Sequence, residues 1–477
     1  MDVEKCAAGI KTTKASLPQN LFLTGKPVFN TKSLKDAVKR FAVSLSNSES
    51  RYQALESFLR RGFPSIEGIE EGAEILSSGR TAVDVVTRLQ ESYLFIQGPP
   101  GSGKTYTSSQ IIVELMRLGK RIGISSNSHK AINNLLEGVV KAAKKKDFQF
   151  RGQKKSNKDQ DDSHFQGEMI QNFFKNTELD LSMNLIAGTA WLFAREEMDR
   201  VLDYLFIDEA GQVSLANLIA MGMSAKNIIL VGDQMQLAQP LQGTHPGDSG
   251  LSCLEYLLQG FSVISPQRGI FLGTSWRMHP QVCRFISEVV YDGKLHAEES
   301  NANQSLILNN HVHPDLKESG VHFLPVQHEG CSQKSEEEGK VVSKLYESLL
   351  QQSFCSRDGN VSAFSHENIL IVTPYNVQVN YLRSILLEEA RVGTVDKFQG
   401  QEAEVVIVSM VTSGAEDLPR DIEFLYSKNR LNVALSRARI LALVVANPGL
   451  LEIPCTTVEQ MRLVNSLCWV REYSTVS

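Results

Sequence analysis

Short apolar runs alternate with longer amphipathic stretches along most of the chain after residue 92. A first series predicts strands at 93–97, 121–125, 204–207 and 227–231, with a helix over 105–118. A second series predicts strands at 369–372, 405–411 and 440–446. Short apolar strands separated by helical spacers are typical of a parallel sheet covered by helices on both faces. The pattern therefore predicts an α/β protein with two such domains.

The two series also predict the domain limits. The change between them falls near 265–275, so we expect one domain at 86–265 and a second at 266–477. Residues 1–85 are mixed in pattern and broken near Gly62 and Gly68, and we expect a mostly helical extension there. The segment 141–158 holds eight Lys or Arg against one acid, which predicts an exposed basic insertion at about 139–184.

Composition agrees with a soluble two-domain protein. A chain of 477 residues is too long for one hydrophobic core. Its net charge of −5 excludes a generally basic surface but leaves room for a local basic groove. The seven cysteines form no C-x-x-C pair, which argues against a zinc or iron–sulfur module and favours a reducing compartment. There is no signal-peptide pattern and no apolar run of ~18–20 residues, so we expect a cytoplasmic location.

A phosphate-binding loop is predicted directly after the first strand. The sequence GPPGSGKT occupies residues 98–105 and opens the predicted helix, which is the context that this pattern requires. Backbone N–H groups of such a loop surround phosphate oxygens, the lysine adds a charge, and the last hydroxyl binds Mg²⁺. A glycine-rich turn without a ligand is the alternative. The predicted nucleotide-binding residues are Gly98, Pro99, Pro100, Gly101, Ser102, Gly103, Lys104 and Thr105.

Two acids follow the strand predicted at 204–207. Asp208 and Glu209 are thereby placed at the carboxyl edge of the sheet, where ligands bind in such folds. Asp208 suits a Mg²⁺ ligand together with Thr105, and Glu209 suits activation of the water that attacks a γ-phosphate. A solvated helix start is the alternative for this pair, and the nearby phosphate loop argues against it.

Six motifs occur in one order along the chain. They are GPPGSGKT (98–105), DEAG (208–211), GDQMQL (232–237), SWRMHP (275–280), VGTVDKFQGQEAEVV (392–406) and RLNVALSRAR (430–439). This set resembles the superfamily 1 helicases. It is most similar to the 1B group, which contains the nonsense-mediated-decay helicase and the flap-processing nuclease-helicase, and within it to bacterial helicase modules associated with RecB-type nucleases. The resemblance implies two RecA-like P-loop NTPase domains over about 93–447.

The resemblance also implies catalytic roles for Lys104, Asp208, Glu209, Gln236, Arg277 and Arg437. Gln236 would sense the γ-phosphate. Arg277 and Arg437 would reach that phosphate from the second domain, as arginine fingers that stabilise transition-state charge, although a surface ion pair is the alternative for either. Gly400 and Glu402 would lie between nucleotide and nucleic acid, with Glu402 on the ribose or on the phosphate-loop lysine.

The same resemblance places nucleic-acid contacts at Ser126, Asn127, His129, Thr189, Thr373 and Tyr375. Small polar side chains at strand ends suit contacts to phosphate and sugar, which position a strand without reading its sequence. Each could equally cap a helix, and Tyr375 could belong to the core. The basic stretch 141–158 would either track a phosphate backbone or be a solvated surface.

In two respects the chain departs from this family. No counterpart is found for the upstream glutamine that reads adenine, so preference for ATP is left open. No nuclease signature is present either, so we expect that any nuclease activity that accompanies this chain lies in another polypeptide or was removed.

The sequence thus predicts an ATP- and Mg²⁺-dependent translocase on single-stranded nucleic acid, 5′ to 3′ by resemblance, with DNA favoured over RNA. The alternatives are an RNA–protein remodelling ATPase and a nucleotide-dependent clamp without unwinding. A P-loop enzyme acting on small molecules is the remotest alternative.

Overall fold

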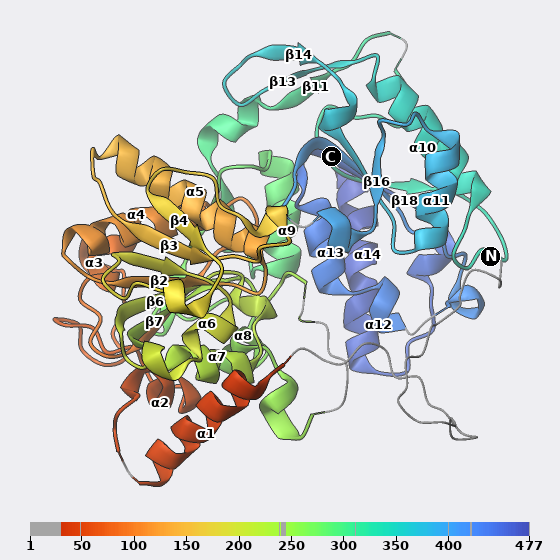
Figure 1. Cartoon of the computed structure of the whole chain (residues 1–477). Coiled ribbons are helices and arrows are strands. Elements are labelled where there is room, and N and C mark those ends of the chain that lie inside the picture. The colour runs from red at the N-terminus through yellow and green to blue at the C-terminus, as the bar shows by residue number, and fades with distance from the viewer. Residues whose placement is uncertain are drawn as a thin grey trace, which may run out of the picture.

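Two α/β units lie side by side in the computed structural model (Figure 1). The structure describes residues 30–47, 49–237, 239, 245–310, 312–398, 400–419 and 422–476. Residues 1–29, which include Cys6 and part of the expected N-terminal extension, lie outside the described residues.

The first unit is built on an eight-stranded sheet in which every neighbouring pair is parallel. Its strand order is β4-β3-β5-β2-β6-β7-β1-β8. The strands are β1 (Tyr93–Gln97), β2 (Ile122–Ser125), β3 (Gly152–Lys155), β4 (Ile170–Phe173), β5 (Leu185–Ala187), β6 (Leu202–Ile207), β7 (Ala225–Gly232) and β8 (Gly269–Phe271).

Helices cover both faces of this sheet, because alternate strand residues point to opposite sides. Leu94 and Ile96 of β1 pack with α3, α4 and α5, whereas Tyr93 and Phe95 pack with the helices of the other face. The first set is α3 (Ala82–Val86), α4 (Lys104–Arg117) and α5 (His129–Lys145); the second is α1 (Lys32–Ser46), α2 (Gln53–Leu59), α6 (Ala190–Phe193), α7 (Leu215–Gly222) and α8 (Cys253–Leu258).

The second unit has a five-stranded parallel sheet in the order β12-β18-β17-β15-β16. Its strands are β12 (Gly320–Pro325), β15 (Ile369–Val372), β16 (Arg391–Gly393), β17 (Ala403–Ser409) and β18 (Ala438–Ala446). One face packs on α10 (Glu336–Leu349) and α11 (Asn376–Ile385). The other packs on α9 (Pro280–Val290), α12 (Ile422–Leu425), α13 (Lys428–Leu435) and α14 (Val458–Val476).

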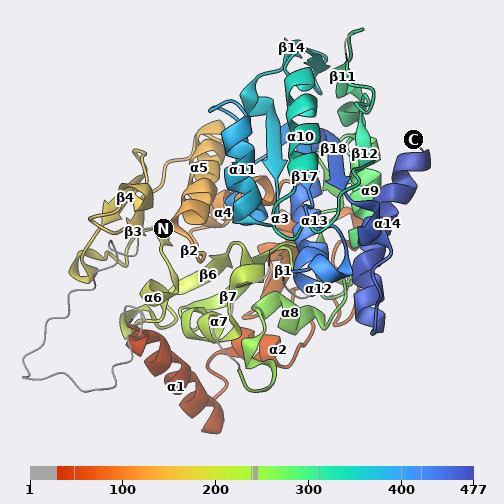
Figure 2. The same ribbon diagram turned by 90° about the vertical axis from the view of Figure 1, so that its right-hand side faces the viewer.

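Two small sheets complete the second unit. Strands β9 (Thr274–Ser275) and β10 (His296–Ala297) pair with each other. Strands β11 (Ser305–Ile307), β13 (Ser353–Cys355) and β14 (Val361–Ala363) form an antiparallel sheet, seen at the upper edge in Figures 1 and 2. In the described part of the chain, no helix combines the length and the apolar character that crossing a membrane requires.

The first sheet extends past the expected domain limit at residue 265. Strand β8 pairs with β1, with Phe95 opposite Gly269, so the chain leaves the first unit only after Phe271. At the other end, the described part of 1–85 is not a separate extension. Phe41 of α1 and Phe58 of α2 belong to one hydrophobic cluster with Tyr93 and Phe95 of the sheet. A long stretch between α2 and α3 is also less helical than expected.

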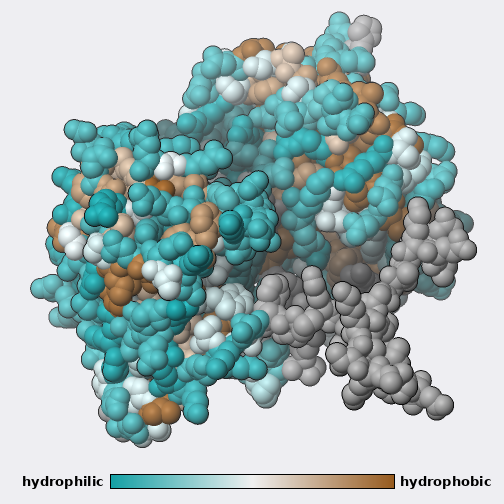
Figure 3. Space-filling model, viewed as in Figure 1, coloured by the Kyte–Doolittle hydropathy of each residue, from teal (hydrophilic) through white to brown (hydrophobic). Residues whose placement is uncertain are grey.

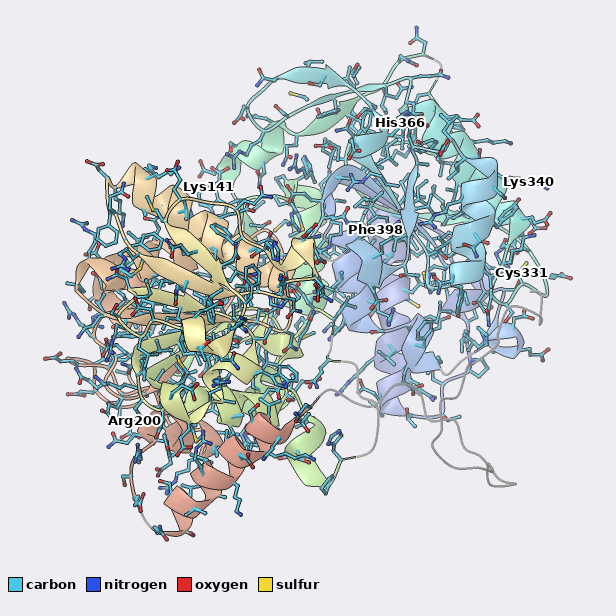
Figure 4. The ribbon with its side chains drawn as sticks, viewed as in Figure 1. Lys141, Arg200, Cys331, Lys340, His366 and Phe398 are labelled. Carbon is cyan, nitrogen blue, oxygen red and sulfur yellow. The ribbon has the colours of Figure 1, made fainter. Side chains whose placement is uncertain are left out.

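The expected basic insertion is only partly exposed. Strands β3 and β4 extend the edge of the first sheet instead of forming a separate loop. Lys141 on α5 is exposed (Figure 4), whereas Lys154 on β3 is fully buried. The sequence missed this burial because a run of lysines gives no sign that one of them lies between a sheet edge and a helix.

Candidate nucleotide and strand-binding sites

The loop 98–103 joins β1 to α4 and has the close packing that a phosphate-binding loop needs. The Gly98 N–H donates to the Gly232 carbonyl over 2.9 Å, which fixes the start of the loop on β7. A Cβ on Gly98 would lie 2.1 Å from Cγ of Lys104, so a side chain there would displace the lysine. Lys104 Nζ donates to the Gly98 carbonyl over 2.6 Å, which keeps the ammonium group over the loop.

Asp208 and Glu209 follow β6 at the same sheet edge, as the sequence predicts. Loss of solvent and the neighbouring Glu209 together raise the pKa of Asp208 to about 7. Glu209 adopts a left-handed backbone conformation with φ of 52°, which turns the chain sharply after Asp208. Both acids line one cavity with Lys104 and Thr105.

This cavity lies between the two units and has a volume of about 600 Å³. The space-filling view shows the surface hollowed between the units (Figure 3). The first unit contributes residues 100–105, the two acids and Gln236 to its wall. The second unit contributes Trp276, Arg277, Gln304, Phe354, Ser356, Arg357, Asp358, Gly400, Glu402, Glu404, Arg437, Arg439 and Ile440.

Both predicted arginines line the cavity, but their hydrogen-bond partners differ. Arg277 Nε donates to Glu402 over 2.5 Å and its Nη1 donates to the Ser436 carbonyl over 3.0 Å. Arg437 is 4% exposed, and its Nη1 donates to the Gln401 carbonyl over a long 3.4 Å. Its Nε and Nη2 have no hydrogen-bond partner among the described residues. Burial lowers the pKa of Arg437 to about 10. A desolvated cation with unused donors at a cavity wall is a site for an anion.

Gln236 is nearly buried and lines the same cavity. Its side-chain N–H donates to the Asp233 carboxylate over 3.2 Å. Asp233 also accepts a 2.5 Å hydrogen bond from the Tyr291 hydroxyl, which belongs to the second unit. The amide that the sequence predicts as a phosphate sensor is therefore oriented by residues of both units.

Gly400 and Glu402 lie at the cavity wall, and among the described residues the ion pairs of Glu402 are with arginines and not with Lys104. Its carboxylate accepts hydrogen bonds from Arg277 and Arg439. These two guanidinium groups lower the pKa of Glu402 despite its burial. Of the two contacts expected for Glu402, the one with the phosphate-loop lysine is replaced by a pair of arginines from its own unit. A contact with the ribose stays a prediction.

The oxygen donors of a Mg²⁺ site are present at one side of the cavity. Thr105 stands in the first turn of α4 and Asp208 at the end of β6, and both line the cavity. Mg²⁺ takes one or two such protein oxygens together with water and substrate phosphates. Burial and the neighbouring Glu209 raise the pKa of Asp208, and a bound cation would stabilise its ionised carboxylate. The pair of oxygen donors therefore fits the ion.

The first predicted strand-binding group follows β2. Ser126 is buried and its hydroxyl has no hydrogen-bond partner among the described residues, so it does not cap a helix. Ser128 instead caps α5, accepting from the Ala131 N–H. Asn127 is exposed and donates to the Gln212 carbonyl. His129 Nδ1 lies 3.4 Å from Nζ of the buried Lys154, and burial lowers the pKa of this histidine.

The later predicted strand-binding residues are divided between surface and core. Thr189 precedes α6 without a side-chain cap hydrogen bond and is half-buried. Thr373 follows β15 with a buried hydroxyl that lacks a partner in the described part of the chain. Tyr375 is 5% exposed and packs against Phe424 with ring centroids 5.8 Å apart. Of its two predicted roles, the core role agrees with this burial.

Several cavity residues were not singled out from the sequence. Trp276 lies in the SWRMHP motif, is 54% exposed and approaches Gly103, where a Cβ would be 3.7 Å from its Cδ1. Its place in a quoted motif was a usable signal. Arg357 and Asp358 lie in the turn between β13 and β14, outside every motif, and carry no local signal of their position at the cavity.

Comparison with known proteins agrees with this geometry. Two family models, each described as an AAA domain, match residues 80–241 and 251–449. The DNA polymerase alpha-associated DNA helicase A of Schizosaccharomyces pombe is 26% identical, over 77% of this chain and 62% of that protein. A regulator of nonsense transcripts 1 homolog of Drosophila melanogaster is 28% identical, over 76% of this chain and 34% of that protein.

The ATP-dependent helicase upf1 of Schizosaccharomyces pombe is 27% identical, over 83% of this chain and 47% of that protein. The chain thus spans between 34% and 62% of the length of these relatives. Two matched AAA domains in tandem, one on each side of the cavity, and this group of relatives make the chain similar to the superfamily 1 helicases, including the group of the nonsense-mediated-decay helicases.

Proposed function

We propose that this chain is a nucleic-acid-dependent ATPase that translocates along a single strand and unwinds duplexes. One observation carries the proposal: the buried, underpaired guanidinium of Arg437 in the second unit and Lys104 in the first unit line the same cavity as Asp208 and Glu209. A cavity that collects two cations and two carboxylates from both sides of an interface suits a nucleoside triphosphate with its metal.

Hydrolysis would use the chain's own groups as follows. Lys104 exchanges the Gly98 carbonyl for phosphate oxygens, and Glu209 accepts a proton from the attacking water. Arg437 places its unused N–H donors on the γ-phosphate as negative charge builds up there. Thr105 and Asp208 would hold Mg²⁺, which would neutralise negative charge on the phosphates.

Of the two arginines, we assign the larger transition-state role to Arg437. Arg277 is already neutralised by Glu402, and its backbone lies against Gly101 of the phosphate loop. It is therefore better placed to hold the loop and the units together. Arg437 has no carboxylate partner within hydrogen-bonding distance among the described residues, so its charge is available to substrate.

Two buried hydroxyls at the strand ends, without a hydrogen-bond partner among the described residues, support a role in binding a strand. Ser126 and Thr373 stand at the ends of β2 and β15, one in each unit, and both hydroxyls are buried without a described partner. Buried polar atoms of this kind normally meet a ligand or water. Phosphate contacts are shared by DNA and RNA, so DNA is proposed on the resemblance to a relative named as a DNA helicase. The 5′ to 3′ direction is proposed on family resemblance alone.

A second candidate is an RNA–protein remodelling ATPase, which the relative named as a regulator of nonsense transcripts favours. A nucleotide-dependent clamp without turnover is less well supported. A clamp needs no water activation, whereas Glu209 and Arg437 line the cavity in a hydrolytic arrangement.

The test is steady-state ATPase activity of the purified chain, with and without single-stranded DNA and RNA of equal length at matched salt. Stimulation by DNA that is lost in Lys104→Ala and Glu209→Gln would support the proposal, and tailed duplexes would then test direction. Stimulation by RNA well above DNA would favour the remodelling ATPase. Turnover at background with saturating amounts of either polymer would favour the clamp and overturn the helicase proposal.

A further inference from the structure

The loop that carries Gln236 is held by the helix that leads to Arg437. Asn429 of α13 donates its side-chain N–H groups to the Gln234 carbonyl over 3.0 Å and to the Gln236 carbonyl over 2.7 Å. Asn432, almost one turn further along α13, donates to the Met235 carbonyl over 2.7 Å. Since α13 belongs to the second unit and the loop to the first, these hydrogen bonds cross between the units.

A second set of hydrogen bonds runs through side chains. The Asn432 amide also donates to the Tyr291 hydroxyl over 3.0 Å. That hydroxyl donates to Oδ2 of Asp233 over 2.5 Å, and Gln236 donates to the same oxygen over 3.2 Å. Tyr291 is fully buried, and Asn432, Asp233 and Gln236 are 2%, 4% and 7% exposed. A continuous buried path thus connects α13 to the amide in the cavity.

Asp233 has few other stabilising contacts. Its carboxylate forms no ion pair with a described cation. Its other oxygen accepts from the Met235 N–H over 3.2 Å and from the Gln97 side-chain N–H over a long 3.5 Å. A buried carboxylate depends on its hydrogen-bond donors, because each one that is lost leaves charge uncompensated in a medium of low polarity. Tyr291 therefore stabilises the ionised form of Asp233, which in turn accepts a hydrogen bond from the Gln236 amide at the cavity wall.

We propose that Asn429, Asn432 and Tyr291 are positioning residues that orient Gln236 through the loop and Asp233 only when α13 is docked, so that Gln236 and Arg437 are set for hydrolysis together. This inference rests on the proposed ATPase function. Closure of the two units and orientation of the Gln236 amide then occur in the same step.

Kinetics of four variants tests the inference: Tyr291→Phe, Asn429→Ala, Gln236→Ala and the double variant Tyr291→Phe/Gln236→Ala. Tyr291→Phe removes one hydroxyl and should lower strand-stimulated kcat by about tenfold to a hundredfold, with the KM for ATP changed less than about twofold. If Tyr291 acts through Gln236, the double variant should be no slower than Gln236→Ala alone, because the effects of residues acting as a unit are not additive.

Tyr346→Phe is the matched control. Tyr346 is also fully buried in the second unit and forms a 2.6 Å hydrogen bond with His366, which Figure 4 labels in the upper part of that unit, and neither residue lines the cavity. It should keep the wild-type kcat. Asn429 is only half-buried, so Asn429→Ala tests the same contact with little risk to folding.

Three outcomes would overturn the inference. These are an unchanged kcat in Tyr291→Phe and Asn429→Ala, a double variant slower by the product of the single effects, or an equal loss in Tyr346→Phe. A wild-type chain without strand-stimulated turnover would instead overturn the proposed function itself. If the wild-type chain shows strand-stimulated turnover but the effects of Tyr291→Phe and Gln236→Ala on kcat are additive, the proposed function is retained and only the coupling of these residues is rejected.

Discussion

The backbone N–H of Trp276 donates a 2.8 Å hydrogen bond to the carbonyl of Gly101. This contact joins the arginine-bearing segment of the second unit to the phosphate loop of the first. The loop is therefore not free to move as a separate turn: its shape and the position of Arg277 are set by one another.

Gly101→Ala should lower nucleotide affinity by more than the strain of an alanine at this positive φ would cause alone. Gly101 has φ of 75°, and a Cβ there would lie 2.6 Å from Cβ of Arg277. Because both atoms are close to the backbone, neither can rotate away, and the loop must shift. We expect nucleotide affinity to fall by about tenfold or more, measured with a fluorescent ATP analogue. Gly119→Ala is the control, since Gly119 has φ of 74° and open space around it. Equal losses in both variants would contradict the packing argument.

Arg437→Met should raise the stability of the nucleotide-free protein while it removes turnover. The change replaces a desolvated, underpaired guanidinium by an apolar chain of similar length, which should add about 1 kcal/mol or more to the free energy of unfolding. Loss of the transition-state charge should lower kcat by about a thousandfold.

Arg277→Met is the comparison for that experiment. Arg277 is paired with Glu402, so its removal leaves a half-buried carboxylate with fewer donors and should lower stability. Thermal unfolding and ATPase assays on both variants decide the matter. An Arg437→Met protein that unfolds more easily than wild type would contradict the assignment of Arg437 as an uncompensated cation.

Lys154→Met should stabilise the protein at neutral pH, and the gain should shrink as pH rises. Burial lowers the pKa of Lys154 from 10.5 to about 8. Below pH 8 the lysine is protonated in both the folded and the unfolded state, so the full desolvation cost is present. Between about pH 8 and 10.5 the folded protein carries the neutral amine, and wild-type stability rises with pH.

Thermal midpoints measured from pH 7 to 10.5 test this prediction. Lys141→Met is the control, because Lys141 is exposed on the neighbouring helix α5. This variant keeps the buried Lys154, so its thermal midpoint should show no gain over wild type that shrinks as pH rises. A Lys154→Met gain that stayed constant over this range would show that titration of the buried amine is not its cause.

Glu338→Leu should strongly destabilise the second unit. Both His328 and Glu338 are fully buried, and His328 Nε2 lies 3.1 Å from Oε1 of Glu338. The other carboxylate oxygen accepts from the Ser409 hydroxyl and the Val411 N–H. Removing the carboxylate leaves these donors unsatisfied and should cost about 3–5 kcal/mol, measured by urea unfolding. Glu336→Gln, at an exposed ion pair on the same helix, should leave the midpoint unchanged; equal effects would refute the burial argument.

Much of the fold could be predicted because its signals are local. Most strands of both sheets are short apolar runs, and their alternate residues separate onto two faces, as Leu94 and Phe95 do on β1. Strand β3, with the sequence Gly-Gln-Lys-Lys, carries no such signal. The last strand of the first sheet was missed, since β8 has three residues and is defined only by its pairing with β1. The extent of the basic insertion was misjudged for the same reason.

The sequence by itself determined the phosphate loop, the acid pair and the order of the six motifs, because each is a contiguous run whose chemistry depends on neighbouring residues. Only the tertiary structure decided that Glu402 pairs with arginines, that Arg437 keeps unused donors, and that Tyr291 reaches Asp233. Burial, pairing and charge compensation arise between residues that lie far apart in the chain, as the sequence separation of 141 between Tyr291 and Asn432 illustrates. Such contacts leave no pattern in a linear sequence, since their energy depends on distance and solvent exclusion in the folded molecule.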